Sequence, residues 1–163
     1  MCEQKVSISN FNGENGIFEM PSARFIGAAY NQMPGKEARE DFGEFLRNLF
    51  KSVIWNDVIK NLPNIINDEL CDFTCEYVQE TDSYTFIAGA FTPEGTPVPK
   101  GLDYRDVLAT TVLISKKEPG KDALDELLNN GKYVVSYDAP SFPWQAFLRA
   151  DTYSINPIKI KED

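Results

Sequence analysis

The stretch that decides the fold lies at residues 83–91 and reads Ser-Tyr-Thr-Phe-Ile-Ala-Gly-Ala-Phe. Aromatic and β-branched residues dominate it and turn-forming residues bound it, which predicts a β-strand. Side chains alternate along a pleated strand, so Phe86 lies on one face while Ile87 and Phe91 lie on the other. Both faces are apolar, which predicts a strand buried on both sides in the middle of a sheet. The small residue Gly89 leaves room for another backbone or a ligand, and we expect a pocket beside this strand.

The length and composition predict a single domain. The chain has 163 residues, of which 42% are hydrophobic, enough for a substantial core. We expect a flexible leader at residues 1–15 and one domain at residues 16–163. The formal net charge of −9 makes direct binding to nucleic acid unfavourable. No stretch approaches the length of a membrane-spanning helix, so we expect no membrane partner.

The residue types restrict the chemistry. The chain contains no histidine, which excludes Ser-His-Asp and Cys-His catalysis and metal sites that need imidazole. Its three cysteines, Cys2, Cys71 and Cys75, form an odd number without disulfide spacing, which predicts a cytoplasmic protein. No companion metal ligands accompany Cys71 and Cys75, so we interpret them as structural thiols and expect no cofactor.

One helix is predicted clearly by its periodicity. Its apolar residues recur at i, i+3, i+4, i+7, i+8 and i+11, which places them on one helical face that we expect to pack on the sheet. These residues are Phe42, Phe45, Leu46, Leu49, Phe50 and Val53. The apolar pattern continues beyond them until Pro63 stops it.

The order of the predicted elements repeats. Strands are predicted at residues 17–30 with a break at Pro21, and at 73–78, 83–91, 106–115, 133–137, 144–153 and 155–160, with a second helix at 121–130. The order strand, helix, strand, strand therefore occurs twice, with the short strand at 133–137 in addition in the second half. Such a repeat can place two helices on one face of an antiparallel sheet with a central ligand cleft between the halves. The predicted fold class is α+β.

Five short segments carry a resemblance to a known family. They are Met-Pro-Ser-Ala-Arg-Phe-Ile-Gly at 20–27, Tyr-Thr-Phe-Ile-Ala-Gly at 84–89, Val-Pro-Lys-Gly-Leu at 98–102, Trp-Gln-Ala-Phe at 144–147 and Ile-Asn-Pro-Ile at 155–158. In this order and spacing, the chain resembles the effector-binding domains of the gyrase-inhibitor-like superfamily over residues 17–160. These domains occur fused to AraC- and MerR-type regulators and as stand-alone proteins. We expect a stand-alone form, since no helix-turn-helix pattern precedes the domain.

The resemblance implies a cleft that binds small molecules, often lipophilic cations, between aromatic rings and a buried carboxylate. Charge and ring quadrupoles attract the cation, while flat rings tolerate many shapes, as in multidrug binding. The family's closing strand usually carries Phe-Glu followed two residues later by Tyr. This chain has Trp144, Gln145 and Phe147 instead, so a neutral amide replaces the expected charge. Either Glu76 or Glu19 supplies a carboxylate from another strand, or the ligand is neutral.

The candidate ligand-binding residues are aromatic and polar residues of the predicted strands and their adjoining loops. They are Tyr30, Glu76, Tyr77, Phe86, Tyr104, Phe142, Trp144, Gln145 and Phe147. An ordinary place in the core explains each ring equally well. Glu76 lies inside a strand, on the predicted face of Thr74 and Val78, which suits a functional carboxylate or an exposed strand face.

We predict a protein that binds a hydrophobic or cationic small molecule and is linked to transcription regulation or xenobiotic sensing. One alternative is a hydrolase of reactive small molecules that uses Glu76 with Tyr77 or Tyr104. Another is an inhibitor that binds a DNA-handling enzyme through its acidic surface, which would require a protein partner. The aromatic content and the absence of histidine favour a binding protein over an enzyme.

Overall fold

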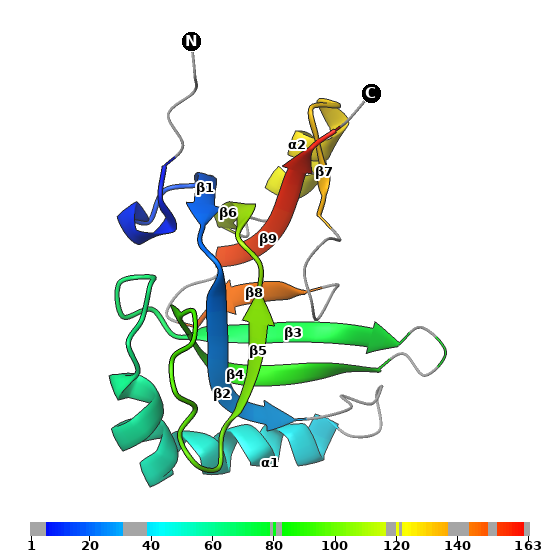
Figure 1. Ribbon diagram of the computed structural model, residues 1–163. Coiled ribbons are helices and arrows are strands. Elements are labelled where there is room, and N and C mark those ends of the chain that lie inside the picture. Colours follow the sequence, from blue (N-terminus) through cyan, green and yellow to red (C-terminus); the bar gives the residue numbers. More distant parts are fainter. Residues whose placement is uncertain are drawn as a thin grey trace.

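The computed structural model describes residues 6–30, 39–78, 80, 83–116, 120, 122–136, 144–149 and 153–161, with only the backbone at 39, 40, 77 and 78. Its fold class is α+β, as predicted (Figure 1). The strands are β1 (Gly16–Met20), β2 (Ala23–Tyr30), β3 (Cys71–Val78), β4 (Ser83–Pro93), β5 (Asp103–Val107), β6 (Thr110–Lys116), β7 (Tyr133–Val135), β8 (Gln145–Leu148) and β9 (Tyr153–Ile160). The helices are α1 (Arg39–Phe50), α2 (Ala123–Asn129), the π-helix Ile54–Val58 and the 3-10 helices Ile8–Asn10 and Ile59–Asn61.

All strand pairs of the sheet are antiparallel. The order across the sheet is β1-β6-β9-β8-β3-β4-β2-β5, and β7 pairs with β9. The strand predicted at 17–30 bends at Pro21, so β1 pairs with β6 while β2 pairs with β4 and β5. The strand predicted at 106–115 likewise divides into β5 and β6. The predicted repeat is present in the order of the elements, and the second half also contains the short strand β7.

One face of the sheet, here called the core face, carries the main hydrophobic core. The rings of Phe25 and Phe73 stack with centroids 4.7 Å apart, and Trp144 stacks on the other side of Phe73 at 5.5 Å. Phe91 of the central strand β4 meets Phe25 edge to face at 4.8 Å. Ring stacking and complete burial of these side chains make this cluster a major source of stability.

The opposite face, here called the helix face, packs against α1. Phe42 of the predicted apolar stripe meets Phe86 of β4 edge to face at 4.8 Å. Tyr30, at the end of β2, contacts Phe42 and Phe45. The predicted packing on the sheet is therefore confirmed for Phe42, Phe45, Leu46, Leu49 and Phe50. It is wrong for Val53, which lies beyond the end of α1 and is 71% exposed. Figure 1 shows α1 along β2 and β4, and α2 at the other end beside β7.

Residues 8–11, within the segment predicted as a leader, contribute to the core. Ile8 is 1% exposed and Phe11 is 8% exposed, and both belong to the cluster on the core face. The Phe11 ring packs edge to face against Phe18 of β1 and Tyr153 of β9. These contacts hold residues 8–11 against the end of the sheet.

The small residue of the central strand makes room for a neighbouring backbone. Gly89 of β4 lies directly opposite Gly27 of β2. A methyl group on Gly89 would lie 1.9 Å from the carbonyl oxygen of Ile26 and 2.6 Å from the Cα atom of Gly27. A side chain at either glycine would therefore separate β2 from β4.

We expect Gly89→Ala to lower the free energy of unfolding by about 2–4 kcal/mol, because the backbone of β2 has to move to admit the methyl group. The matched control is Gly43→Ala in α1, where the nearest atom is Nη1 of the flexible Arg47 side chain at 3.4 Å. That control should raise the free energy of unfolding by about 0.5–1 kcal/mol, because Ala has a higher helix propensity than Gly. Urea denaturation measures the free energy of unfolding of both variants. An equal change in the two variants would contradict the close approach of the β2 and β4 backbones at Gly89.

Candidate functional site

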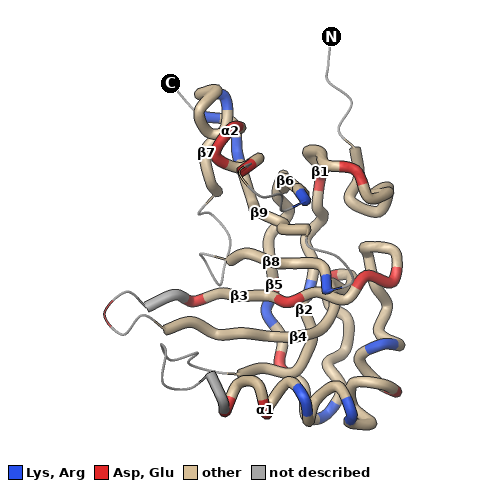
Figure 2. The backbone as a smooth tube through the Cα atoms, turned by 180° about the vertical axis from the view of Figure 1, so that it is seen from behind, with Lys and Arg blue, Asp and Glu red and all other residues tan. Residues whose placement is uncertain are grey.

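The strand registers align side chains in rows across the helix face. Residues directly opposite each other in antiparallel strands share a face. One row runs from Tyr30 through Phe86 and Thr74 to Gln145, because these residues are successive partners on β2, β4, β3 and β8. The row is aromatic beneath α1 and becomes polar towards the second half of the chain. Figure 2 shows β8, β3 and β4 side by side between α1 and α2.

A neighbouring row crosses the junction between the two halves. It contains Asp72 of β3, Phe147 of β8, Ser154 of β9 and Ser115 of β6, which are again successive partners. Gln145 and Phe147 are half-buried residues on the same face of β8. The structure therefore places an amide and an aromatic ring side by side near the middle of the sheet.

A chain of hydrogen bonds connects polar residues from four adjacent strands, here called the polar strip. Its members are Thr74, Ser115, Gln145, Ser154 and Asn156. The Nε2 atom of Gln145 donates to Oδ1 of Asn156 at 2.8 Å, and Nδ2 of Asn156 lies 3.4 Å from Oγ of Ser154. Asn156 is only 7% exposed, so these bonds satisfy polar groups that water reaches poorly. The network holds the Gln145 amide in one orientation.

Asn156, Ser154 and Ser115 are residues of the site that were not predicted from the sequence. Their signal is present in the alternation of residues 153–156, where Ser154 lies between Tyr153 and Ile155 of the core face and Asn156 follows Ile155. Strand periodicity therefore places both on one face. Their contact with Gln145 depends on the β8–β9 pairing, which the sequence pattern does not specify.

Two of the predicted rings lie where α1 covers the sheet. Phe86 is 6% exposed and is in contact with Phe42, and Tyr30 packs between Phe42 and Phe45. These rings stabilise the contact between helix and sheet. Their role in ligand binding stays a prediction.

Glu76 departs from the alternation expected for its strand. The pairing of β3 with β4 is irregular between Cys75 and Val78, and Glu76 has a left-handed φ of 58°. A bulge re-aims a side chain, so the predicted shared face with Thr74 is not formed. Oε1 of Glu76 accepts a bond from Nε of Arg105 at 2.8 Å, and Arg105 lies opposite Phe25 of the core face.

The partners of Glu76 set its protonation. Burial acts to raise its pKa, but hydrogen bonds from Arg105 and from the Cys75 thiol outweigh this effect and lower the pKa below its usual value. The carboxylate is therefore ionised and paired. Burial raises the pKa of the Cys75 thiol to about 12, which makes this cysteine a poor nucleophile.

The other predicted residues lie apart from the polar strip. Tyr104 is on the end strand β5, with the guanidinium carbon of Arg24 4.4 Å from its ring centroid. Trp144 is 4% exposed and belongs to the core face. Phe142 and the side chain of Tyr77 lie outside the described residues. The structure thus brings Gln145 and Phe147 together but not the whole predicted set.

Asp72 is the carboxylate nearest to the polar strip in the strand register, and a cation neutralises its charge. Asp72, opposite Phe147, accepts a hydrogen bond from Nη1 of Arg149. The Arg149 guanidinium also stacks over the ring of Phe50 at 4.1 Å, which attaches the end of α1 to the sheet. Burial raises the pKa of Asp72, and the charge and hydrogen bond of Arg149 limit this rise. Glu19 is the other candidate for the missing carboxylate. Its Oε1 atom accepts a hydrogen bond from the hydroxyl of Thr111, across the β1–β6 pair.

We expect Arg149→Met to lower the free energy of unfolding by about 1–3 kcal/mol near neutral pH, because it leaves a partly buried carboxylate without its cation. Without Arg149, the folded-state pKa of Asp72 rises further above its unfolded value. As the pH falls through that folded-state pKa, Asp72 becomes protonated and neutral. The variant therefore recovers part of its lost free energy of unfolding in acid. Urea denaturation near neutral pH and in mild acid measures the difference.

The matched control is Asp72→Asn in the Arg149→Met background. It should recover part of the stability near neutral pH and make the remaining loss independent of pH in this range. A loss from Arg149→Met that is equal at both pH values would contradict the role of Asp72.

Within the described ranges, the Cys, Asp and Glu residues form no group of three suited to a metal ion. None of the helices in those ranges combines the length and the apolar character needed to cross a bilayer.

Comparisons with known proteins give information about the fold. No family model and no curated protein matches the chain. The structure of SAV2435 bound to tetraphenylphosphonium is similar, with a TM-score of 0.57, 10% identity and coverage of 91% of this chain and 94% of that one. A protein from Staphylococcus aureus MU50 that is assigned to bacterial transcription regulation has a TM-score of 0.54, 8% identity and coverage of 93% and 100%. The chain shares the fold of a protein solved with a lipophilic cation and of one assigned to transcription regulation.

Proposed function

We propose that the protein binds a hydrophobic small molecule at the polar strip and acts as an effector-binding protein in transcription regulation or xenobiotic sensing. The observation that carries this proposal is the half-buried pair of Gln145 and Phe147 on β8. The ring offers apolar contact area, and the amide offers a directional hydrogen bond, which is the usual composition of a small-molecule site.

The geometry favours a neutral ligand with a hydrogen-bond donor. Nε2 of Gln145 donates one of its two hydrogens to Asn156, and this bond orients Oε1 as an acceptor for a donor on the ligand. The strip itself contains no carboxylate, and Asp72 beside it is paired with Arg149. A desolvated cation would therefore lack the opposite charge that offsets its loss of hydration.

The fold supports a binding function, and the local residues modify its expected ligand. SAV2435 has the same fold and was solved with tetraphenylphosphonium. In this chain the residue at the expected position of the carboxylate is Gln145. We therefore infer that the protein accepts neutral aromatic compounds at least as well as aromatic cations.

The hydrolase alternative depends on Glu76 as a base. Its carboxylate is paired with Arg105 at 2.8 Å, and its pKa is lowered, so it is a weak base. Binding without turnover is the better account of these residues.

Two aromatic probes of similar shape test the preference for neutral ligands. Triphenylmethanol carries a hydroxyl donor, and tetraphenylphosphonium carries a positive charge. We expect triphenylmethanol to raise the melting temperature and quench tryptophan fluorescence at least as strongly as tetraphenylphosphonium. Gln145→Glu should strengthen binding of the cation about tenfold and leave the alcohol equal or weaker, because it adds an opposite charge at the site.

The control is Asn129→Asp on the exposed surface of α2, which adds the same charge away from the strip. It should leave both affinities near those of the unmodified protein. If neither probe binds, the proposed function is contradicted. Equal effects of Gln145→Glu and Asn129→Asp would contradict the position of the site.

A further inference from the structure

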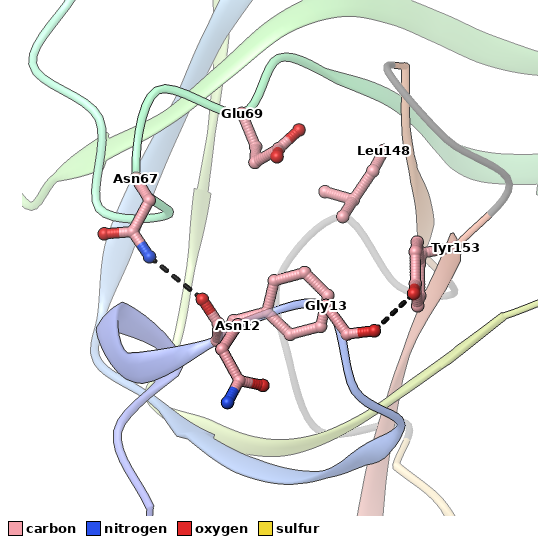
Figure 3. Close-up of a pocket in the computed structure, with 7 residues that line it drawn as sticks. Asn12, Gly13, Asn67, Glu69, Leu148 and Tyr153 are labelled. Atoms are coloured by element: carbon pink, nitrogen blue, oxygen red, sulfur yellow. Dashed lines mark hydrogen bonds between the residues drawn. The ribbon is translucent and has the colours of Figure 1, made fainter.

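A pocket of about 340 Å³ lies at the end of the core (Figure 3), and none of its lining residues belongs to the polar strip. Three segments far apart in the sequence form it: the chain before β1, the loop before β3, and the facing ends of β8 and β9. The lining residues are Phe11, Asn12, Gly13, Asn67, Glu69, Leu148 and Tyr153. None of the predicted ligand-binding residues that the structure describes belongs to this set. The volume is at the lower end of the range for small-molecule sites, which is about 300–1,000 Å³.

Hydrogen bonds between the segments fix the walls of this pocket. Nδ2 of Asn67 donates to the carbonyl oxygen of Phe11 at 3.0 Å, and the Tyr153 hydroxyl donates to the carbonyl oxygen of Gly13 (Figure 3). The side chain of Asn64 also donates to the carbonyl oxygen of Glu69 at 2.7 Å. The pocket is therefore formed before a ligand enters, which limits the entropy lost on binding.

The chemistry of the pocket is set by one carboxylate. Figure 3 shows the Glu69 carboxylate extending into the space between the labelled lining residues, and the Phe11 ring also lines this pocket. Within the described part of the chain, no side chain forms an ion pair or hydrogen bond with this carboxylate. Arg149, the cation next to Leu148 in the sequence, is engaged by Asp72. An unpaired negative charge thus faces apolar and aromatic walls.

We propose that this pocket is a second ligand site, which binds a small organic ammonium ion with an apolar body. The ammonium group donates charge-assisted hydrogen bonds to Glu69. The rings of Phe11 and Tyr153, whose centroids are 5.4 Å apart, contribute apolar area. The Phe11 ring attracts the cation through its quadrupole, since Nζ of Lys116 already lies over the Tyr153 ring, 6.0 Å from its centroid. Leu148 contacts the apolar body of the ligand.

Other ligand classes fit these residues less well. Ca²⁺ and Mg²⁺ need about six oxygen ligands, usually with more than one carboxylate, whereas this pocket supplies one carboxylate and two side-chain amides. An anion would be repelled by Glu69. A neutral ligand would leave the carboxylate partly desolvated without compensation. The organic ammonium ion alone uses both the charge and the rings.

The test measures binding of phenethylammonium and of its neutral counterpart 2-phenylethanol by calorimetric titration of the full chain. We expect phenethylammonium to bind and 2-phenylethanol to bind at least about tenfold more weakly, because the alcohol lacks the charge that pairs with Glu69. Glu69→Gln, which keeps the size of the side chain, should weaken the amine about tenfold or more and leave the alcohol unchanged.

The matched control is Asp68→Asn, which removes the neighbouring charge outside the pocket. Asp68 has a φ of 62°, a conformation that Asn adopts readily, so this substitution should preserve the loop. It should change the amine affinity less than threefold, about the effect expected of a screened charge without direct contact.

Several outcomes would overturn the proposal. These are no binding of phenethylammonium at millimolar concentrations, equal binding of the alcohol, or equal losses from Glu69→Gln and Asp68→Asn. Nuclear magnetic resonance gives an independent readout of position. Amide shifts on titration should centre on Gly13 and Asn67, and shifts centred on Gln145 instead would also refute the second site.

Discussion

The pairing of β3 with β8 is the interaction on which the candidate site depends, because it joins the first half of the chain to the second. Its register places Thr74 opposite Gln145 on the helix face and Phe73 opposite Ala146 on the core face. A slip of one residue would turn Gln145 towards the apolar core and Ala146 towards the polar strip. The stacked rings of Phe73 and Trp144 oppose such a slip, since they fill the core face beside this pair. The core therefore determines the geometry of the polar face.

The sequence was most informative where one physical pattern dominated. Periodicity predicted α1 and both faces of β4, because apolar side chains must be buried on the face that meets another element. It misplaced Glu76, because a bulge changes the alternation through local backbone geometry rather than composition. It did not identify Glu69 or Tyr153 as pocket residues, since contacts between the ends of strands and a loop depend on long-range pairing. Gln145 was found through a departure from a family pattern, and its partner Asn156 emerged only in the folded chain.

The two proposed sites differ in the way that charge is handled. Around the polar strip, the ion pair of Asp72 and Arg149 neutralises the neighbouring carboxylate, and hydrogen bonds satisfy the amides. In the pocket at the end of the core, Glu69 has no such partner among the described residues. The apolar core lies on the opposite face of the sheet from the strip, so the two sites have separate surroundings. One chain can in this way present a neutral site and an anionic site to different ligands.

The hydrogen-bond polarity of the strip explains why an amide suits position 145. Gln145 donates to Oδ1 of Asn156, and the Nδ2 atom of Asn156 is directed at Ser154. A carboxylate at position 145 has no proton to donate, so Asn156 would have to rotate its amide and offer Nδ2 instead. Ser154 can accommodate this rotation, because its hydroxyl either accepts a bond or donates one, and the Ser115 hydroxyl lies 3.3 Å away as a further partner. The strip therefore favours a neutral side chain through the direction of its bonds, while the two serines allow a charged one without leaving a buried group unpaired.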